Sequence, residues 1–222
     1  MTSIHPPSVW QDVLRNRLAY ALTQSRFAHA PLADGGMPAA TRWRLPARAV
    51  QVSDAAAQAL AEMLGTGTAA QHRELTKRCL QQYRQMAADG GQDDLGRVLA
   101  AYLGACRQAF DQEALSTQRW QAITQWLQAW VIDEMPWDDE PLGERQDAFE
   151  RFATLAVALG EWTVQASRQG TAELGSATRM ARDSLSKQLG LDLPALCAVL
   201  KGLDVVPTVK ELRATLAPTA AN

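Results

Sequence analysis

Apolar residues recur at spacings of three and four along almost the whole chain, which is the period of an amphipathic α-helix. The first such segment, about residues 8–29, begins at Ser8 directly after two prolines. The same spacing predicts six further helices, over about residues 53–65, 68–88, 93–110, 116–134, 144–169 and 171–190. Beyond Leu193 it allows two short helices, one beginning at Pro194 and one over residues 208–216.

Residues that favour helix ends stand at most of these boundaries. Serine, threonine and aspartate favour the N-cap, and glycine favours the position just after the last turn. The predicted N-caps are Ser53, Asp93, Ser116 and Thr171, and the predicted ends are Gly65, Gly170 and Gly190. Segments 31–46 and 135–143, which are rich in proline or glycine, are predicted to be loops.

Strand signals are few, and the best of them, residues 204–206, is only three residues long. The fold class is therefore predicted to be all-α. Short links between helices favour antiparallel neighbours, so we expect a single bundle of about six to eight mostly antiparallel helices. Residues 1–50 are predicted to form an N-terminal helix and a wrapping loop, and residues 51–222 the helical bundle domain.

Composition and net charge limit the classes of function that the protein can have. The chain has 222 residues, of which 47% are hydrophobic, and a net charge of −2 from 22 basic and 24 acidic side chains. Such a composition can bury a core, while the small net charge argues against general nucleic-acid binding. No apolar run reaches the length of a membrane span. Without a signal-peptide pattern the expected location is cytoplasmic, or periplasmic if a leader has been removed.

Residue patterns typical of catalysis or metal binding are missing from the sequence. It contains no HExxH, GxSxG or phosphate-binding glycine motif, and none of its three histidines is paired at metal-ligand spacing. His72 and the three cysteines (Cys79, Cys106 and Cys197) lie at or beside apolar helix positions, where burial is the expected role. We therefore expect no catalytic residues, no metal and no cofactor.

One carboxylate falls inside the most apolar predicted helix. Glu161 follows Gly160 in the sequence LGEW, so burial would require an arginine partner or a raised pKa. Pairing with an arginine is the favoured interpretation. The alternative is an enzyme whose site is assembled from scattered residues such as Glu161, Tyr102 and His72.

Charge is distributed unevenly along the chain. Residues 91–150 carry four basic and twelve acidic side chains, whereas the segments on either side are net positive. The extreme is VIDEMPWDDEPLGE, in which acids surround one tryptophan. The candidate partner-binding residues are Asp133, Glu134, Trp137, Asp138, Asp139 and Glu140.

This acidic segment has two interpretations. It is either a solvated loop, facing the arginines Arg42, Arg44 and Arg48, or a surface whose acids steer a basic partner while Trp137 anchors it. A calcium loop of the EF-hand type is disfavoured by the prolines and by the missing glycine.

Three sequence blocks follow one another from Asp93 onward: QDDLGRVLAAYLGACRQAF, LGEWTVQASRQG and SLSKQLGLDL. They contain Asp94-Leu95 at a helix start, Gly160-Glu161 in an apolar helix, and Gly190-Leu191-Asp192-Leu193 at the close. In this order they resemble an uncharacterised all-helical bacterial family, a domain of unknown function, over about residues 93–200. Members of that family often look exported and have no assigned catalytic residues, so the resemblance implies a helical fold and transfers no active site.

These observations favour a non-enzymatic bacterial interaction module. Its most concrete form is a cognate inhibitor of the immunity type, or a chaperone, that binds a bacterial effector or toxin with a basic surface. The first alternative is a homo-oligomeric structural or secretion-apparatus component, which associates through an exposed face of Trp120, Trp126 and Trp130. The second is an enzyme with an unrecognised site.

Overall fold

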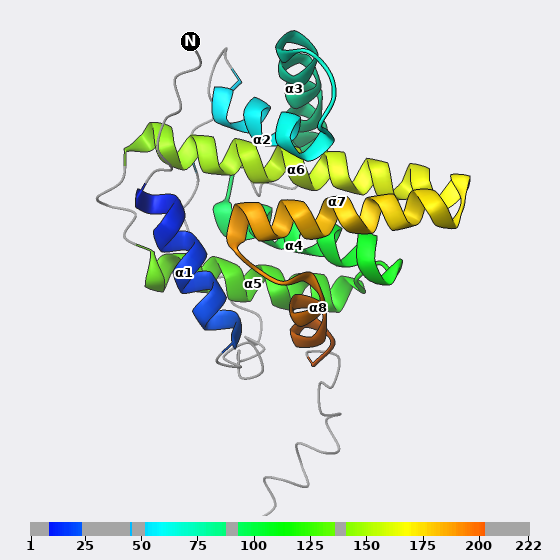
Figure 1. Ribbon diagram of the computed structural model, residues 1–222. Coiled ribbons are helices and arrows are strands. Elements are labelled where there is room, and N and C mark those ends of the chain that lie inside the picture. Colours follow the sequence, from blue (N-terminus) through cyan, green and yellow to red (C-terminus); the bar gives the residue numbers. More distant parts are fainter. Residues whose placement is uncertain (1–8, 24–44, 46–51, 88–92, 136–140, 203–222) are drawn as a thin grey trace, which may run out of the picture.

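Helices are the regular secondary structure of the described part of the chain, which confirms the predicted all-α fold class. A computed structural model describes residues 9–23, 45, 52–87, 93–135 and 141–202 (Figure 1). These residues form eight helices and no β-strand. The helices are α1 (Val9–Thr23), α2 (Asp54–Leu64), α3 (Ala69–Met86), α4 (Leu95–Asp111), α5 (Thr117–Glu134), α6 (Leu142–Gln169), α7 (Thr171–Leu189) and α8 (Leu193–Gly202).

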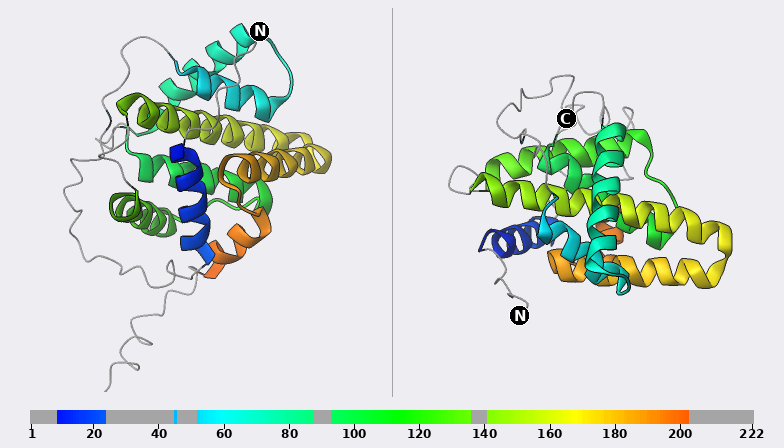
Figure 2. Two further views of the ribbon diagram at one scale, coloured as in Figure 1. Left: turned by 60° about the vertical axis from the view of Figure 1, so that its left-hand side comes forward. Right: turned by 90° about the horizontal axis from the view of Figure 1, so that it is seen from above.

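The long helix α6 is the centre of the fold, and it packs against α2, α3, α4 and α7. Its two middle turns are buried on nearly all sides, from Phe152 to Val157. In Figures 1 and 2, α4, α5, α6 and α7 run roughly alongside one another, whereas α1 and α3 cross them. The bundle is therefore built on α6, with crossing helices on its outside.

Helices α4 and α5 approach each other more closely than ordinary side chains would allow. Gly96 is buried, and a Cβ atom at this position would lie 2.5 Å from the Cα atom of Gln128 on α5. The missing side chain thus lets the two backbones pack almost directly on each other.

Several predicted helix ends are confirmed. The side chains of Ser53 and Ser116 accept hydrogen bonds from the third residue of α2 and of α5, respectively. Gly65 and Gly190 end α2 and α7 in the left-handed conformation, with φ of 70° and 64°. Local capping chemistry therefore places these boundaries correctly.

Two predicted N-caps are wrong. The cap of α4 is Asp94, which accepts the Arg97 N–H at 2.7 Å, whereas the neighbouring Asp93 forms a two-point ion pair with Arg84. Helix α7 follows Gly170 without a side-chain cap, and Thr171 is its first helical residue. Two adjacent aspartates both suit an N-cap by local chemistry, and a tertiary partner, Arg84, decides between them.

Burial of the Asp94 cap leads to a pH prediction. Desolvation raises the pKa of Asp94 above its ordinary value of 3.8, although hydrogen bonds from Arg97 and Gln128 oppose the shift. The folded chain then holds this proton more tightly than the unfolded chain does. Ionisation of Asp94 therefore lowers the free energy of unfolding as the pH rises from 3.8 through the raised pKa.

We therefore expect the Asp94→Asn variant to gain stability relative to the parent chain as the pH is raised from about 4 to about 7, because asparagine keeps the cap and does not ionise. Urea unfolding of both chains across this range measures the difference. A difference that does not change with pH would contradict the prediction.

Other boundaries differ modestly from expectation. Helix α6 begins at Leu142, within the predicted loop 135–143, and α1 is described only as far as Thr23. The short helix near Pro194 is confirmed as α8, where Asp192 accepts the Ala195 N–H at 3.0 Å. The predicted loop 31–46, except Leu45, and the predictions for residues 204–206 and 208–216 lie outside the described residues.

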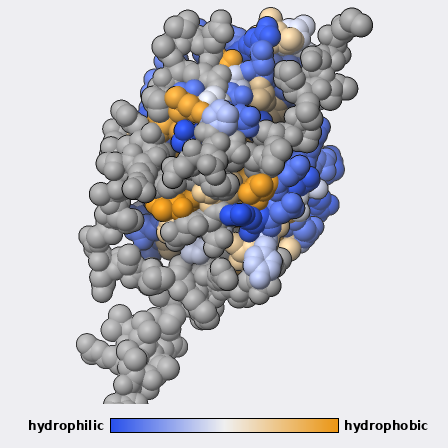
Figure 3. Space-filling model, turned by 90° about the vertical axis from the view of Figure 1, so that its left-hand side faces the viewer, coloured by the Kyte–Doolittle hydropathy of each residue, from blue (hydrophilic) through white to orange (hydrophobic). Residues whose placement is uncertain are grey.

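Within the described ranges, no helix combines the length and the hydrophobicity that crossing a bilayer requires. Figure 3 shows the face at the left-hand side of Figure 1. There the hydrophobic residues that the structure describes form several patches among hydrophilic ones.

Candidate binding surfaces

The acidic segment identified from the sequence falls mainly outside the described residues. Asp133 and Glu134 are the last residues of α5. Trp137, Asp138, Asp139 and Glu140 are not among the residues that the structure describes. Both interpretations of this segment, a solvated loop or a partner surface, thus stay predictions.

The structure exposes Glu161 and buries another carboxylate of the same helix. The Glu161 side chain is 42% exposed and lies 3.7 Å from Arg78 of α3, so the predicted arginine partner is found without the burial. The buried acid is Glu150, which is 3% exposed and accepts the Ser53 N–H at 2.8 Å. Glu150 thus ties the start of α2 to α6.

The scattered residues of the enzyme hypothesis have separate surroundings. Tyr102 is fully buried and shares a 2.8 Å hydrogen bond with Ser184 of α7. His72 contacts the carbonyl oxygen of Thr66 at 2.7 Å, and Glu161 faces Arg78. Among the described residues, no group of three or more histidine, cysteine or acidic side chains could hold a metal ion.

The cysteines lie in the core, as the apolar pattern predicts. None of Cys79, Cys106 and Cys197 forms a disulfide, and all three are buried. Burial, reinforced by the nearby charge of Glu161, raises the pKa of the Cys79 thiol to about 11. A thiol with so high a pKa is a poor nucleophile near neutral pH.

The tryptophans of α5 do not form the exposed face that the homo-oligomer hypothesis assumed. Trp130 is 7% exposed and stacks on Trp126 with ring centroids 6.1 Å apart. Trp120 and Trp126 are partly buried and pack against the core. Self-association stays a prediction. The predicted exposed face of three indoles is wrong, because Trp130 is buried and Trp120 and Trp126 pack against the core.

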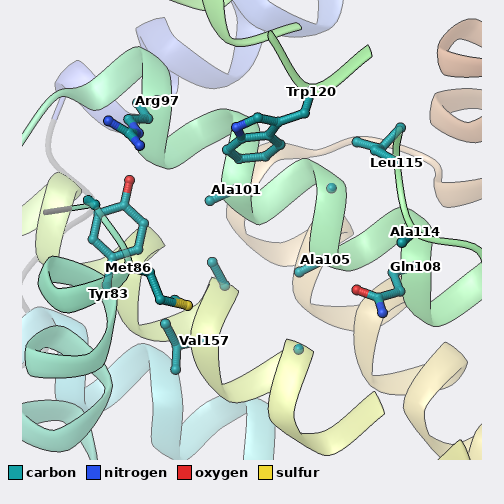
Figure 4. A pocket seen from close by; sticks show the side chains of 14 residues that line it. Tyr83, Met86, Arg97, Ala101, Ala105, Gln108, Ala114, Leu115, Trp120 and Val157 are labelled. Carbon is teal, nitrogen blue, oxygen red and sulfur yellow. The ribbon is translucent and has the colours of Figure 1, made fainter. Parts of the chain in front are cut away.

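A recess of about 370 Å³ lies between four helices, and we call it the α4–α6 furrow. Its floor consists of small residues of α4 and α6, and its walls come from the end of α3, the link between α4 and α5, and α5 (Figure 4). The floor residues are Ala101, Gly104, Ala105, Ala156, Val157 and Gly160, and the wall residues are Tyr83, Met86, Ala87, Leu115 and Trp120. The furrow is thus mainly apolar.

The polar groups of the furrow are unevenly placed. Arg97 is the charged residue among those that line it, and Figure 4 shows the Tyr83 hydroxyl pointing toward the Arg97 guanidinium. The Tyr83 side chain is 5% exposed, and its ring packs edge-on against Phe149. No hydrogen bond to the Tyr83 hydroxyl is found among the described residues, and burial raises the pKa of this phenol, so it stays protonated.

A second surface lies where α6 and α7 meet. Thr178 of α7 donates a hydrogen bond to the carbonyl oxygen of Ala109 near the end of α4. The parts of α6 and α7 beyond this contact project from the bundle as a hairpin (Figure 1). Trp162 is 41% exposed on this hairpin, beside a recess of about 250 Å³ that Glu173 also lines. We call this surface the hairpin recess.

Sequence reasoning identified neither surface. Gly160 and Trp162 were noted only as neighbours of Glu161 in the sequence LGEW. The signal that could have identified the first surface was Gly160. Glycine inside a long helix costs stability, so its presence there indicates a close contact or an open space.

Comparison with known proteins gives a family and nothing closer. The model of a family of unknown function (DUF6683) matches residues 39–203, which confirms the resemblance seen in the sequence and extends it toward the N-terminus. No curated protein and no solved structure matches the chain.

Proposed function

Because the chain belongs to a family of unknown function (DUF6683), we propose a role from its own surfaces, that of a non-enzymatic protein-interaction module. In its most concrete form the protein is a cognate inhibitor of the immunity type, or a chaperone, that binds a bacterial effector or toxin. The observation that supports this role best is the exposed indole of Trp162 on a projecting hairpin.

An exposed tryptophan beside a recess is the arrangement that interface anchors use. Tryptophan is among the residues that most often dominate the binding energy of protein interfaces. A partner side chain that enters the hairpin recess would pack against the Trp162 ring and lose its water there.

Charge beside the indole favours a basic partner. Glu173 lines the hairpin recess, and Glu161 precedes Trp162 and is engaged only at 3.7 Å by Arg78. An arginine or lysine could therefore lie over the indole face and pair with a carboxylate. The acidic segment 133–140 is a separate candidate, because it precedes the start of α6 whereas the hairpin recess lies near the end of that helix.

The test begins with isolation of the partner from the native host with the full chain as bait. We expect Trp162→Ala to weaken binding of that partner about 30-fold or more, because an anchor of this kind contributes 2 kcal/mol or more. Tyr20→Ala is the matched control, since Tyr20 is an exposed aromatic residue on α1 and is 59% exposed. Equal loss in both variants, or no loss in either, would contradict a hairpin interface.

A separate variant tests the acidic segment. Replacing Trp137 together with Asp138 and Asp139 by alanine is expected to weaken binding of the same partner and to reduce its salt dependence. Unchanged binding would remove the segment from the interface while leaving the hairpin result intact.

A further inference from the structure

We infer that the α4–α6 furrow binds a small neutral molecule that is mainly aromatic and carries one hydrogen-bonding group, of the size of a two-ring aromatic alcohol. This site is separate from the hairpin recess, and it does not depend on the proposed protein partner. The open floor of the furrow, the side chains around the floor and the buried hydroxyl of Tyr83 each support it.

The floor of the furrow stays open at the expense of helix stability. Gly160 lines the furrow on α6, and a Cβ atom added there would meet none of the described atoms within 4 Å. No close contact therefore requires this glycine, although alanine would make α6 a better helix. The recess of about 370 Å³ lies within the range of about 300 to 1,000 Å³ that is typical of small-molecule sites. The floor thus leaves room for a ligand of that size.

The side chains around the floor favour an aromatic ring. Tyr83 of α3 and Trp120 of α5 both line the furrow, and aromatic side chains pack well against another ring face to face or edge to face (Figure 4). A Cβ atom at Gly104 would lie 3.5 Å from the Trp120 ring, so this ring lies close to the α4 backbone. Met86 also lines the furrow and is 62% exposed, so its flexible thioether is able to pack over a bound ring.

One buried hydroxyl group determines which polar group the ligand needs. The Tyr83 side chain is 5% exposed, and no hydrogen bond to its hydroxyl is found in the described part of the chain. Figure 4 shows this hydroxyl pointing toward Arg97, which lines the same furrow. A buried hydroxyl without a hydrogen bond costs stability. A ligand group that donates a hydrogen bond to this oxygen, or accepts one from it, would remove that cost.

The charges near this hydroxyl favour a neutral ligand. Burial raises the pKa of Asp94, and the backbone N–H and the positive charge of Arg97 oppose this rise, so Arg97 already faces a carboxylate. The neighbouring Asp93 is held by Arg84. A charged ligand would therefore lose its water in the furrow and would have to compete with charges that the protein already balances.

The experiment titrates the full chain with N-phenyl-α-naphthylamine, a neutral aromatic amine whose fluorescence rises in apolar surroundings. We expect a saturable rise with one site per chain. We expect β-naphthol to displace this probe. β-Naphthalenesulfonate, which has the same rings and a negative charge, should displace it about tenfold more weakly or less well still.

The variant Tyr83→Phe tests the hydrogen bond. β-Naphthol should bind this variant about fivefold more weakly than the parent chain, because one hydrogen bond is lost. β-Methylnaphthalene, in which a methyl group replaces the hydroxyl, should bind both chains equally. Equal binding of β-naphthol to both chains, or an equal loss for both ligands, would contradict a role for the Tyr83 hydroxyl.

Further variants locate the site. Gly160→Leu fills the furrow and is expected to weaken β-naphthol binding about tenfold or more. Gly143→Leu is the matched control, because it makes the same change in the same helix, again with no described atom within 4 Å of the new Cβ. Trp162→Ala removes the indole of the hairpin recess and should leave β-naphthol binding unchanged. Unfolding in urea checks that each variant is folded.

Three results would overturn the proposal. These are no saturable binding of the fluorescent probe, full binding of β-naphthol by Gly160→Leu, and loss of β-naphthol binding in Trp162→Ala. The last result would place the aromatic ligand at the hairpin recess instead. Binding of the protein partner is measured separately, so its loss in Trp162→Ala does not affect this inference.

Discussion

Replacing Gly96 by alanine is expected to destabilise the fold by about 3 kcal/mol or more, because the new methyl group has no space. Its Cβ atom would lie 2.5 Å from Cα and 2.6 Å from the backbone nitrogen of Gln128. Both atoms belong to the backbone of α5, so no side-chain rotation can relieve the overlap. Helices α4 and α5 would have to separate, and the packing around Leu99 and Leu127 would loosen with them.

Urea unfolding of the two chains measures this effect, and Gly160→Ala is its control. Alanine at Gly160 meets nothing within 4 Å and is expected to raise the free energy of unfolding by about 0.5 to 1 kcal/mol. The same substitution in two helices should therefore have opposite signs. A loss of similar size in both variants would mean that helix geometry, and not the α4–α5 contact, explains Gly96.

Replacing Asp111 by alanine is expected to cost about 3 to 5 kcal/mol, because it removes the carboxylate from a buried ion pair. The Arg107 Nε lies 3.2 Å from the Asp111 carboxylate, and the two side chains are 2% and 8% exposed. Without this carboxylate, the buried guanidinium keeps its desolvation penalty and loses the attraction of Asp111. The measurement is again the free energy of unfolding in urea.

The double variant Arg107→Met with Asp111→Leu separates charge from packing. Replacing both members of a buried pair by apolar residues of similar size is often nearly neutral, so we expect it to recover most of the stability lost in Asp111→Ala. If the double variant is as unstable as the single one, shape at this position matters more than the loss of the Asp111 carboxylate.

The helices themselves were predictable, because the signals that define them are local. Apolar spacing gave seven of the eight described helices, and Ser53, Ser116 and Gly190 marked ends that the structure confirms. Local chemistry failed where two candidates competed, as at Asp93 and Asp94. There the choice depended on Arg84, nine residues before Asp93 in the chain.

Which residues of a helix are buried was less predictable than the position of the helix itself. Glu161, for which burial was considered, is 42% exposed, because the buried residues on its side of α6 end at Val157. Glu150, eleven residues earlier in the same helix, is the buried acid because the start of α2 covers it. Sequence spacing shows which side of a helix is apolar, but it does not show how far along the helix that side is covered.

The sequence by itself determined the all-α class, most helix boundaries and the family, since all three follow from patterns within a few residues or along the linear order of the chain. Only the tertiary structure decided the α4–α6 furrow, the hairpin recess and the close contact at Gly96. Each of these depends on how closely two or more helices pack, even where the helices follow each other in the chain, as α4 and α5 or α6 and α7 do. Such distances are fixed by the combined packing of many side chains, so no single segment encodes them.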